Sequence, residues 1–284
     1  RDAADRDDFL GRAEGALGVR PEVIGGEEEA ALAFVGAAGG LAGPAPYLVI
    51  DVGGGSTEFV FGVGGPEFVR SIDLGSRRVT ERYLHRHPAG SEALAAARRA
   101  AGGAFAVVDL PGAAGTVIGT GGAYTALAAI ALGLERYDPD RVHGSVLSLA
   151  ALDGLAGRLA GLSLEETAAL PSLDPARAPV LLGGAVVGVE ALRRSGSIEI
   201  GVSEADLLAG IARHPHLETV PCQGVLAQAS DRRLIVHDQQ RSTAAPRYGD
   251  GGKHAALLRR PRFALAGGRL VVTALEDVVP RLRT

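Results

Sequence analysis

Apolar and polar residues follow a strand-like pattern in one central region of the chain. Residues 46–52, PYLVIDV, are almost continuously apolar, which predicts a buried strand. Residues 57–63 and 67–75 predict two further strands. Short stretches that contain glycine separate these segments, so we expect tight turns between them. The pattern therefore predicts a three-strand meander.

Helical spacing of apolar residues dominates the rest of the first 213 residues. Residues 5–17 begin with acids, which the helix dipole favours at an N-terminus. Short strands are predicted at residues 20–24, 114–122 and 198–203. Helices are predicted at residues 25–41, 76–86, 91–108, 123–134, 146–170 with a break near Gly161, 177–196 and 204–213. The order of elements indicates an α/β fold with a helix-rich second half.

The composition of the sequence changes after about Arg213. Residues 214–284 are polar, rich in Arg and interrupted by Pro and Gly, with 11 basic against 6 acidic residues. The preceding residues carry 18 basic against 27 acidic residues. We place a boundary there and interpret residues 214–284 as a divergent Arg-rich tail, for which disorder and some local structure near residues 269–282 are both open.

Composition excludes several classes of protein. With 284 residues of which 46% are hydrophobic, the chain can form one large core or two modest ones. Cys222 is the only cysteine, which excludes a disulfide framework. No apolar run reaches about 18 residues, so we expect no membrane span and a cytoplasmic protein. The chain has no methionine, which is typical of a fragment or a processed chain.

The stretch DVGGGSTEF, residues 51–59, contains the most distinctive chemistry. The glycine turn brings Asp51 and Glu58 together and lets backbone N–H groups approach a ligand closely. Hydroxyl and N–H donors suit a phosphate, whereas carboxylates repel one. A Mg²⁺ ion between them would reconcile the two, since it prefers oxygen ligands. The alternative is a glycine-rich hairpin whose acids face solvent.

Two further segments allow a functional and a structural interpretation. Residues 119–127, GTGGAYTAL, lead a strand into a helix N-terminus, which is an anion site or an ordinary turn. The stretch GGEEEAALAF begins a helix with three glutamates. These either complement the helix dipole or place one base near the phosphate loop.

A polyanionic substrate would need local positive charge, because the net charge of the chain is −4. That value argues neither for nor against a nucleic-acid partner. Four arginines after the glycine hairpin could form a basic track, although a solvated helix face is equally consistent with the pattern. These are Arg70, Arg77, Arg78 and Arg82.

Six stretches of the chain, in the same order, resemble the exopolyphosphatase and guanosine pentaphosphate phosphatase (Ppx/GppA) family. The resemblance covers roughly residues 1–212. The stretches are VIGGEEEAALAFVGA, DVGGGSTEF, SIDLGSRRVTERY, VIGTGGAYTALAAI, RVHGSVLS and IGVSEADLL.

The resemblance implies an actin-like ATPase (ribonuclease H-like) fold of two domains, the first of them incomplete here. It implies that residues 1–34 are a remnant of the first domain and residues 35–213 the second domain. The family's first phosphate loop has no counterpart, and about 90 residues before Arg1 are expected to be missing. A homodimer is the family-level expectation, with no nucleic-acid or membrane partner.

The resemblance also assigns roles to individual residues. Glu29 matches the proposed catalytic base, while Asp51 and Glu58 match acids that hold metal and position water, with Mg²⁺ as the cofactor. Phosphate-binding positions are Arg1, Gly53, Gly54, Gly55, Ser56, Gly121 and Gly122.

The implied activity is release of the terminal phosphate of inorganic polyphosphate by water. One alternative substrate is guanosine pentaphosphate (pppGpp). A phosphotransferase, or an inactive truncated protein that binds phosphate or an alarmone, are alternatives of other classes. Release of free phosphate without an acceptor would distinguish the hydrolase from both.

Overall fold

The computed structural model describes most of the central region of the chain and parts of both ends. The chain divides into two compact units, of which one is residues 26–210 and the other combines residues 1–25 with residues 211–284. The described residues are 6–17, 21–22, 26–205, 209, 233–236, 263–266 and 269–272.

A six-stranded mixed sheet lies at the centre of the 26–210 unit, in the order β4-β3-β2-β5-β7-β6. Strands β2, β3 and β4 are successive antiparallel neighbours, so the structure confirms the predicted meander. Strands β5 and β7 continue the sheet in parallel, and β6 closes it antiparallel. The strands are β2 (Tyr47–Val52), β3 (Thr57–Gly62), β4 (Pro66–Ile72), β5 (Thr116–Thr120), β6 (Val146–Ser148) and β7 (Glu199–Val202).

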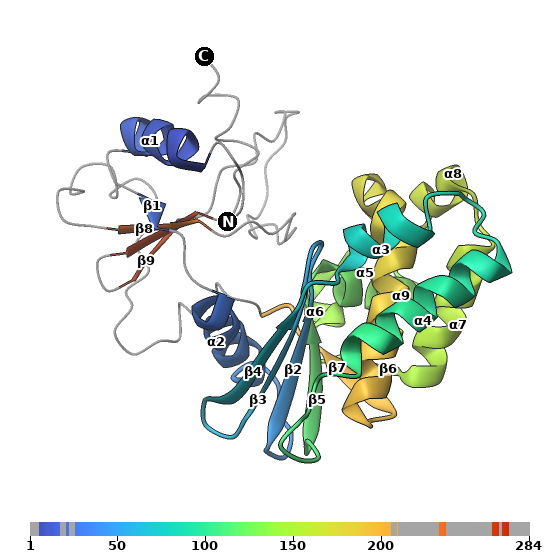
Figure 1. Cartoon of the computed structure of the whole chain (residues 1–284), viewed down its shortest axis with the longest axis horizontal. Helices are drawn as coiled ribbons and strands as arrows, with labels where there is room; N and C mark the ends of the chain where they lie inside the picture. The colour runs from blue at the N-terminus through green and yellow to red at the C-terminus, as the bar shows by residue number, and fades with distance from the viewer. Residues whose placement is uncertain are drawn as a thin grey trace, which may run out of the picture. The chain divides into compact units, whose positions relative to one another are not determined.

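Helices cover both faces of this sheet, but unevenly (Figure 1). Helix α2 (Gly26–Ala38) lies alone on one face, and the other helices of the unit gather on the opposite face. We call these the α2 face and the α3 face. The helices of the second group are α3 (Ser76–Tyr83), α4 (Ser91–Phe105), α5 (Gly122–Ala131), α6 (Pro139–Val142), α7 (Leu149–Ala160), α8 (Leu164–Ala168), η1 (Pro175–Arg177) and α9 (Ala178–Ser195).

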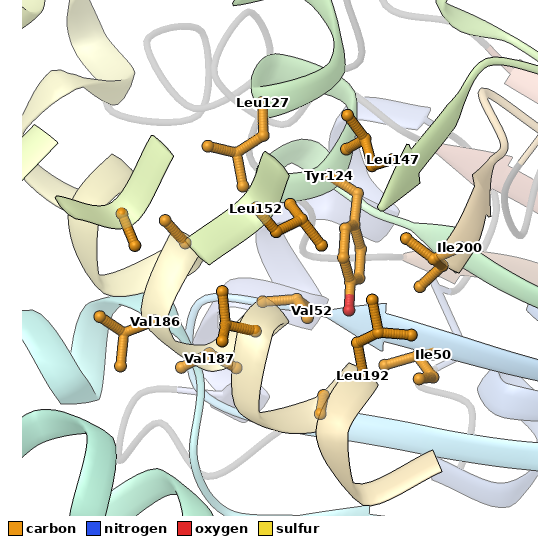
Figure 2. Close-up of a cluster of buried hydrophobic side chains, with 14 of the residues drawn as sticks. Ile50, Val52, Tyr124, Leu127, Leu147, Leu152, Val186, Val187, Leu192 and Ile200 are labelled. Carbon is orange, nitrogen blue, oxygen red and sulfur yellow. The ribbon is translucent and has the colours of Figure 1, made fainter. Parts of the chain in front are cut away.

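The larger core lies between the sheet and α9, and the buried Tyr124 is at its centre (Figure 2). The hydroxyl of Tyr124 donates to the carbonyl oxygen of Gly188 at 3.1 Å, so its polar end is satisfied. The segment Pro175–Ser195 is long and apolar enough to cross a membrane by length and composition. However, 67% of its apolar window is buried inside the structure, which is the position of a core helix.

Strand alternation decides which side chains reach which face. Val49, Val60 and Ile118 are buried in a small core against α2. Their neighbours along the strands, such as Ile50 and Phe59, belong to the larger core. Successive side chains point to opposite faces, so residues two positions from Val49, Val60 and Ile118 lie on the α2 face. This assignment locates the acids of the site.

One local prediction is wrong, since residues 146–148 form a strand rather than the start of a helix. Val146–Ser148 pairs antiparallel with β7, and α7 begins directly afterwards. The side chain of Ser148 accepts a hydrogen bond from the N–H of Ala151, which caps α7. Sheet pairing therefore prevails over helical spacing in these three residues. The helix expected at residues 204–213 lies largely outside the described residues.

The second unit contains a four-stranded sheet in the order β1-β8-β10-β9, together with α1 (Arg6–Leu17). Its strands are β1 (Pro21–Glu22), β8 (Arg233–Val236), β9 (Phe263–Ala266) and β10 (Arg269–Val272). Three of these strands fall within residues 214–284. The expected boundary between residues 34 and 35 falls inside α2, which belongs to the 26–210 unit. The assignment of domains stays a prediction.

Candidate active site

The loop between β2 and β3, residues 53–56, is held in place by the first turn of α3. The N–H of Gly53 donates to the carbonyl of Ser56 at 3.0 Å, which closes the loop. The N–H groups of Ser76 and Arg77 donate to the carbonyls of Gly53 and Gly54, both at 2.9 Å. Two N–H groups that a helix normally leaves without partners thus fix the orientation of the loop. We call residues 53–56 the cradle loop.

This anchoring turns backbone donors away from α3. In a trans peptide the C=O and the following N–H point in opposite directions. Because the carbonyls of Gly53 and Gly54 point at α3, the N–H groups of Gly54 and Gly55 point away from it. Within residues 26–205, the N–H groups of Gly54, Gly55 and Ser56 donate to no protein acceptor. Three adjacent donors are therefore left for an anion.

The fold itself does not require glycine at two of the three glycine positions. Neither Gly54 nor Gly55 has a positive φ. Among the described residues, a Cβ at Gly54 would come no closer than 3.9 Å to another atom, and one at Gly55 no closer than 3.8 Å. Both are ordinary contacts. Packing therefore does not account for these glycines, whereas close approach of a ligand to the backbone would.

Gly75 is a part of the site that sequence reasoning missed. A Cβ there would lie 2.6 Å from the carbonyl oxygen of Gly53, so α3 can approach the cradle loop only if residue 75 has no side chain. The buried Thr57 fixes the same turn, because its hydroxyl donates to the carbonyl of Leu74 at 2.6 Å. The signal in the sequence was a glycine directly before a helix, in DLGS.

The predicted acids lie next to the cradle loop, on the α2 face of the sheet. Asp51 and Glu58 are direct cross-strand neighbours on β2 and β3. Such neighbours have Cβ atoms about 4.5–5.5 Å apart. Asp51 is 8% exposed, and Glu58 accepts a hydrogen bond from the hydroxyl of Ser71 at 2.7 Å. The structure therefore brings both carboxylates and the donor loop together at one end of the sheet.

Thr120, at the end of β5, is a second site residue that the sequence did not reveal. It pairs with Asp51 in parallel register, so it also lies on the α2 face. Thr120 is 1% exposed, and its hydroxyl finds no hydrogen-bond partner among the described residues. The sequence showed only an unremarkable threonine before a glycine pair.

The second glycine loop, residues 119–122, is filled by the protein's own side chains. A Cβ at Gly121 would lie 2.5 Å from Oδ1 of Asp51, and the φ of Gly121 is +87°. A Cβ at Gly122 would overlap the guanidinium of Arg177. The carboxylate and the guanidinium therefore lie directly against the two predicted phosphate-binding glycines. Arg177 is a cation beside the N-terminus of α5, and sequence reasoning did not select it.

Polar side chains near this second loop are bonded mainly to one another. The hydroxyl of Tyr137 donates to the Glu204 carboxylate, and the N–H of Glu204 donates to Nδ1 of His143 at 3.2 Å. Burial first, and then the charge of Glu204, raise the pKa of Tyr137 above its ordinary value. The other ring nitrogen of His143 lies 3.0 Å from the carbonyl of Gly40. These groups serve as internal ties.

Two predicted site residues, Glu29 and Arg1, lie at the limits of the described residues. Glu29 lies in the first turn of α2, directly before Ala30, which is buried against the α2 face. The side chain of Glu29 and the whole of Arg1 lie outside the described residues. The role of Glu29 as base and the phosphate contact of Arg1 stay predictions.

The site offers a donor set that suits Mg²⁺ better than Zn²⁺. Among the described residues, no group of three or more His, Cys, Asp or Glu side chains is placed to hold a metal ion. Zn²⁺ normally takes at least three protein ligands. Mg²⁺ is usually bound by one or two carboxylates plus phosphate oxygens and water. Asp51 and Glu58 next to a phosphate-type loop fit that second pattern.

Comparison with known proteins identifies the family. The model of the Ppx/GppA phosphatase family matches residues 1–211. The chain belongs to this family. Exopolyphosphatase 2 of Mycobacterium tuberculosis is 40% identical to the chain over 227 residues, which cover 75% of the chain and 70% of that protein. The resemblance read from the six sequence stretches is thus confirmed.

Solved structures agree with the family assignment. An exopolyphosphatase-like protein is 36% identical, with a TM-score of 0.69 over 75% of the chain and 73% of that protein. The Aquifex aeolicus Ppx/GppA family member is 29% identical, with a TM-score of 0.68 over 74% and 69%. These neighbours belong to the actin-like ATPase superfamily. The mixed α/β fold with its six-stranded sheet is consistent with that superfamily.

Proposed function

We propose that this member of the Ppx/GppA family is an exopolyphosphatase, which removes terminal phosphate from inorganic polyphosphate with the help of Mg²⁺. One observation carries the proposal: the N–H groups of Gly54, Gly55 and Ser56 form a donor surface that no acceptor within residues 26–205 uses. The name of the M. tuberculosis relative supports the choice of polyphosphate. Within the proposal, this chain carries the second domain of an actin-like fold.

In this proposal the cradle loop orients the terminal phosphoryl group. Its three N–H donors are fixed in advance by the hydrogen bonds to α3. Donors that need no rearrangement stabilise developing negative charge more effectively than mobile ones do. Asp51 and Glu58 would hold Mg²⁺ beside the loop. When bound there, the ion would neutralise charge on the phosphoryl oxygens.

Glu29 is the proposed base that acts on the attacking water. The helix that carries it covers the α2 face, the same face that bears Asp51 and Glu58. Glu29 accepts a proton from water while the water oxygen bonds to the terminal phosphorus. The bridging P–O bond breaks, and its electron pair stays on the shortened chain. Positioning and electrostatics supply most of the rate in such reactions.

Phosphate release measured with two substrates tests this function. The 284-residue chain is incubated with polyphosphate or with pppGpp, with Mg²⁺ and then with excess chelator. We expect Mg²⁺-dependent release from polyphosphate without any acceptor, faster than release from pppGpp. An Asp51→Asn variant should need far more Mg²⁺ for the same rate, whereas an Asp109→Asn variant, at an exposed position outside the cradle loop, should behave as the wild type.

The other outcomes identify the competing functions. Faster release from pppGpp would make this chain a guanosine pentaphosphate phosphatase. Phosphate that appears only when an acceptor is added would indicate a phosphotransferase. Binding of either substrate without release would indicate a phosphate-binding protein that is not an enzyme.

A further inference from the structure

We infer that Arg77 and Arg78 bind the phosphoryl groups that follow the terminal one, and so set the direction in which the substrate lies across the cradle loop. The inference rests on the proposed function, because it assumes that the loop holds a terminal phosphoryl group. It adds a second binding subsite with its own residues and a preference for linked phosphates over single ones.

The position of the two arginines relative to the loop is the first observation. Nη2 of Arg77 lies 3.9 Å from the place where a Cβ of Gly54 would be, and Nε of Arg78 lies 3.8 Å from the corresponding place at Gly55. Side chains in the first turn of a helix lean toward its N-terminus, which here faces the loop. Each guanidinium therefore runs alongside one glycine of the loop.

The state of the two charges is the second observation. Arg77 is exposed and makes no ion pair or hydrogen bond through its side chain among the described residues. Arg78 donates to the carbonyl of Asp73 at 3.2 Å and lies 3.8 Å from its carboxylate, with side chains 52% and 89% exposed. An exposed pair of this kind contributes little to stability. Both guanidinium groups can therefore turn toward a ligand at small cost.

The two faces of the sheet supply the direction. The acids lie on the α2 face, whereas Val79 of α3 is buried in the core on the α3 face. The cradle loop lies at the end of the sheet, between the two faces. A chain of phosphates whose terminal group meets Asp51 and Glu58 must leave the loop on the side away from those carboxylates. On that side its charge meets Arg77 and Arg78.

Guanidinium groups suit this task for a chemical reason. Each presents a planar set of N–H donors that matches two phosphate oxygens. Orthophosphate fills the loop alone and does not reach this subsite. Pyrophosphate and tripolyphosphate do reach it, so the subsite distinguishes phosphoanhydrides from single phosphates.

Equilibrium binding of orthophosphate and of tripolyphosphate, each with Mg²⁺, tests the inference in four variants. We expect Arg77→Ala and Arg78→Ala each to weaken tripolyphosphate binding about 10-fold, as for loss of a charge-assisted pair. Orthophosphate binding should change less than twofold. Arg77→Lys should recover part of the loss, and the loss should shrink at high salt.

Arg82→Ala is the matched control, because it removes the same charge from the same helix. The sequence allowed Arg82 as part of a basic track, but residue 82 lies five positions beyond Arg77, about 7.5 Å further along the helix axis from the cradle loop. We expect it to bind both ligands as the wild type does. Equal loss in Arg82→Ala and Arg77→Ala would overturn the inference, and so would equal loss of both ligands in Arg77→Ala.

Binding and phosphate release by the wild-type protein distinguish failure of this inference from failure of the proposed function. If it binds neither ligand, the phosphate cradle itself is wrong and the subsite falls with it. If it binds tripolyphosphate but releases no phosphate, the hydrolase proposal fails while the comparison of variants still decides the role of the arginines.

Discussion

The two glycine-rich loops of the 26–210 unit look alike in sequence, yet different things occupy the space beside their glycines. In the second loop, Asp51 lies against Gly121 and Arg177 lies against Gly122. In the cradle loop, Gly54 and Gly55 have room for a side chain, and their N–H groups have no protein acceptor within residues 26–205. The second loop needs glycine in order to pack, whereas packing does not require glycine at positions 54 and 55 of the cradle loop.

This difference explains why both loops meet at one place. The second loop brings β5 and α5 so close to β2 that the Asp51 carboxylate is held against Gly121. The cradle loop then presents its donors beside that same carboxylate. One loop therefore positions the acid, and in the proposed function the other positions the phosphoryl group.

The largest effect on turnover is expected at Glu29, on the helix that covers the α2 face. Glu29→Gln should lower turnover of polyphosphate by about 10²- to 10⁴-fold, the usual contribution of a general base. Binding of tripolyphosphate should stay within a few-fold of the wild type, because the charge removed is not a phosphate ligand. Initial rates and equilibrium binding on the same samples measure both.

Glu27→Gln is the control for that variant, since it removes an acid from the same helical turn at another angle around the axis. Its turnover should be unchanged. If both variants lose activity equally, the first turn of α2 acts only through its total charge and Glu29 is not the base.

The next largest effect concerns stability at the second loop. Gly121→Ala should lower the free energy of unfolding by about 3 kcal/mol, from backbone strain at positive φ together with the clash against Asp51. Urea unfolding followed by circular dichroism measures the loss. A variant as stable as the wild type would show that this loop is not closed by packing.

At the cradle loop we expect a substitution to weaken phosphate binding and to leave stability almost unchanged. Gly54→Ala should weaken orthophosphate binding by about 10- to 100-fold, because the new methyl group would keep the phosphate away from the backbone N–H donors. Hydrogen bonds to a charged group contribute about 1.5–3 kcal/mol. The unfolding free energy of this variant should change by less than about 1 kcal/mol, since the new methyl group fits and φ is allowed. Calorimetric titration and urea unfolding together reveal the contrast with Gly121→Ala. Full affinity in Gly54→Ala would remove the distinction between the loops.

A smaller effect on stability is expected at Tyr124, which follows the second loop in α5 and is buried in the larger core. Tyr124→Phe loses the hydrogen bond to Gly188 and should cost about 1 kcal/mol. Burial, and then the Asp51 carboxylate, raise the pKa of Tyr124 above its ordinary value of 10.0. The folded state therefore keeps this proton after the unfolded chain has released it.

The pH dependence follows from that difference. The contribution of Tyr124 to stability is complete below pH 10 and falls above it, by up to about 1.4 kcal/mol per pH unit. Unfolding measured between pH 9 and pH 11 should show a shallower decline in Tyr124→Phe than in the wild type. An equal decline in both proteins would mean that Tyr124 titrates normally in the folded state.

Local patterns in the sequence predicted the elements that frame the site. The apolar run of residues 46–52 and the β-forming residues at 57–63 predicted β2 and β3, and the turn between them placed Asp51 opposite Glu58. Their nearness needs only the geometry of a hairpin, which neighbouring residues determine. The strand β6 was missed because three residues are too few to show a period before the helix that follows.

Contacts between distant segments could not be predicted in the same way. Gly75 matters because it touches Gly53, which is 22 positions away in the sequence. Arg177 lies against Gly122, which is 55 positions away. No periodicity records such contacts. For the same reason the sequence could not show that side chains of the protein itself occupy the space beside Gly121 and Gly122.

Backbone amide shifts measured by NMR during a titration with orthophosphate and Mg²⁺ test the central claim most directly. The account predicts large downfield shifts for the N–H groups of Gly54, Gly55 and Ser56, as expected for donors that gain a charged acceptor. The N–H groups of Gly121 and Gly122 should move little. Shifts confined to Gly121 and Gly122, with residues 54–56 unchanged, would contradict it.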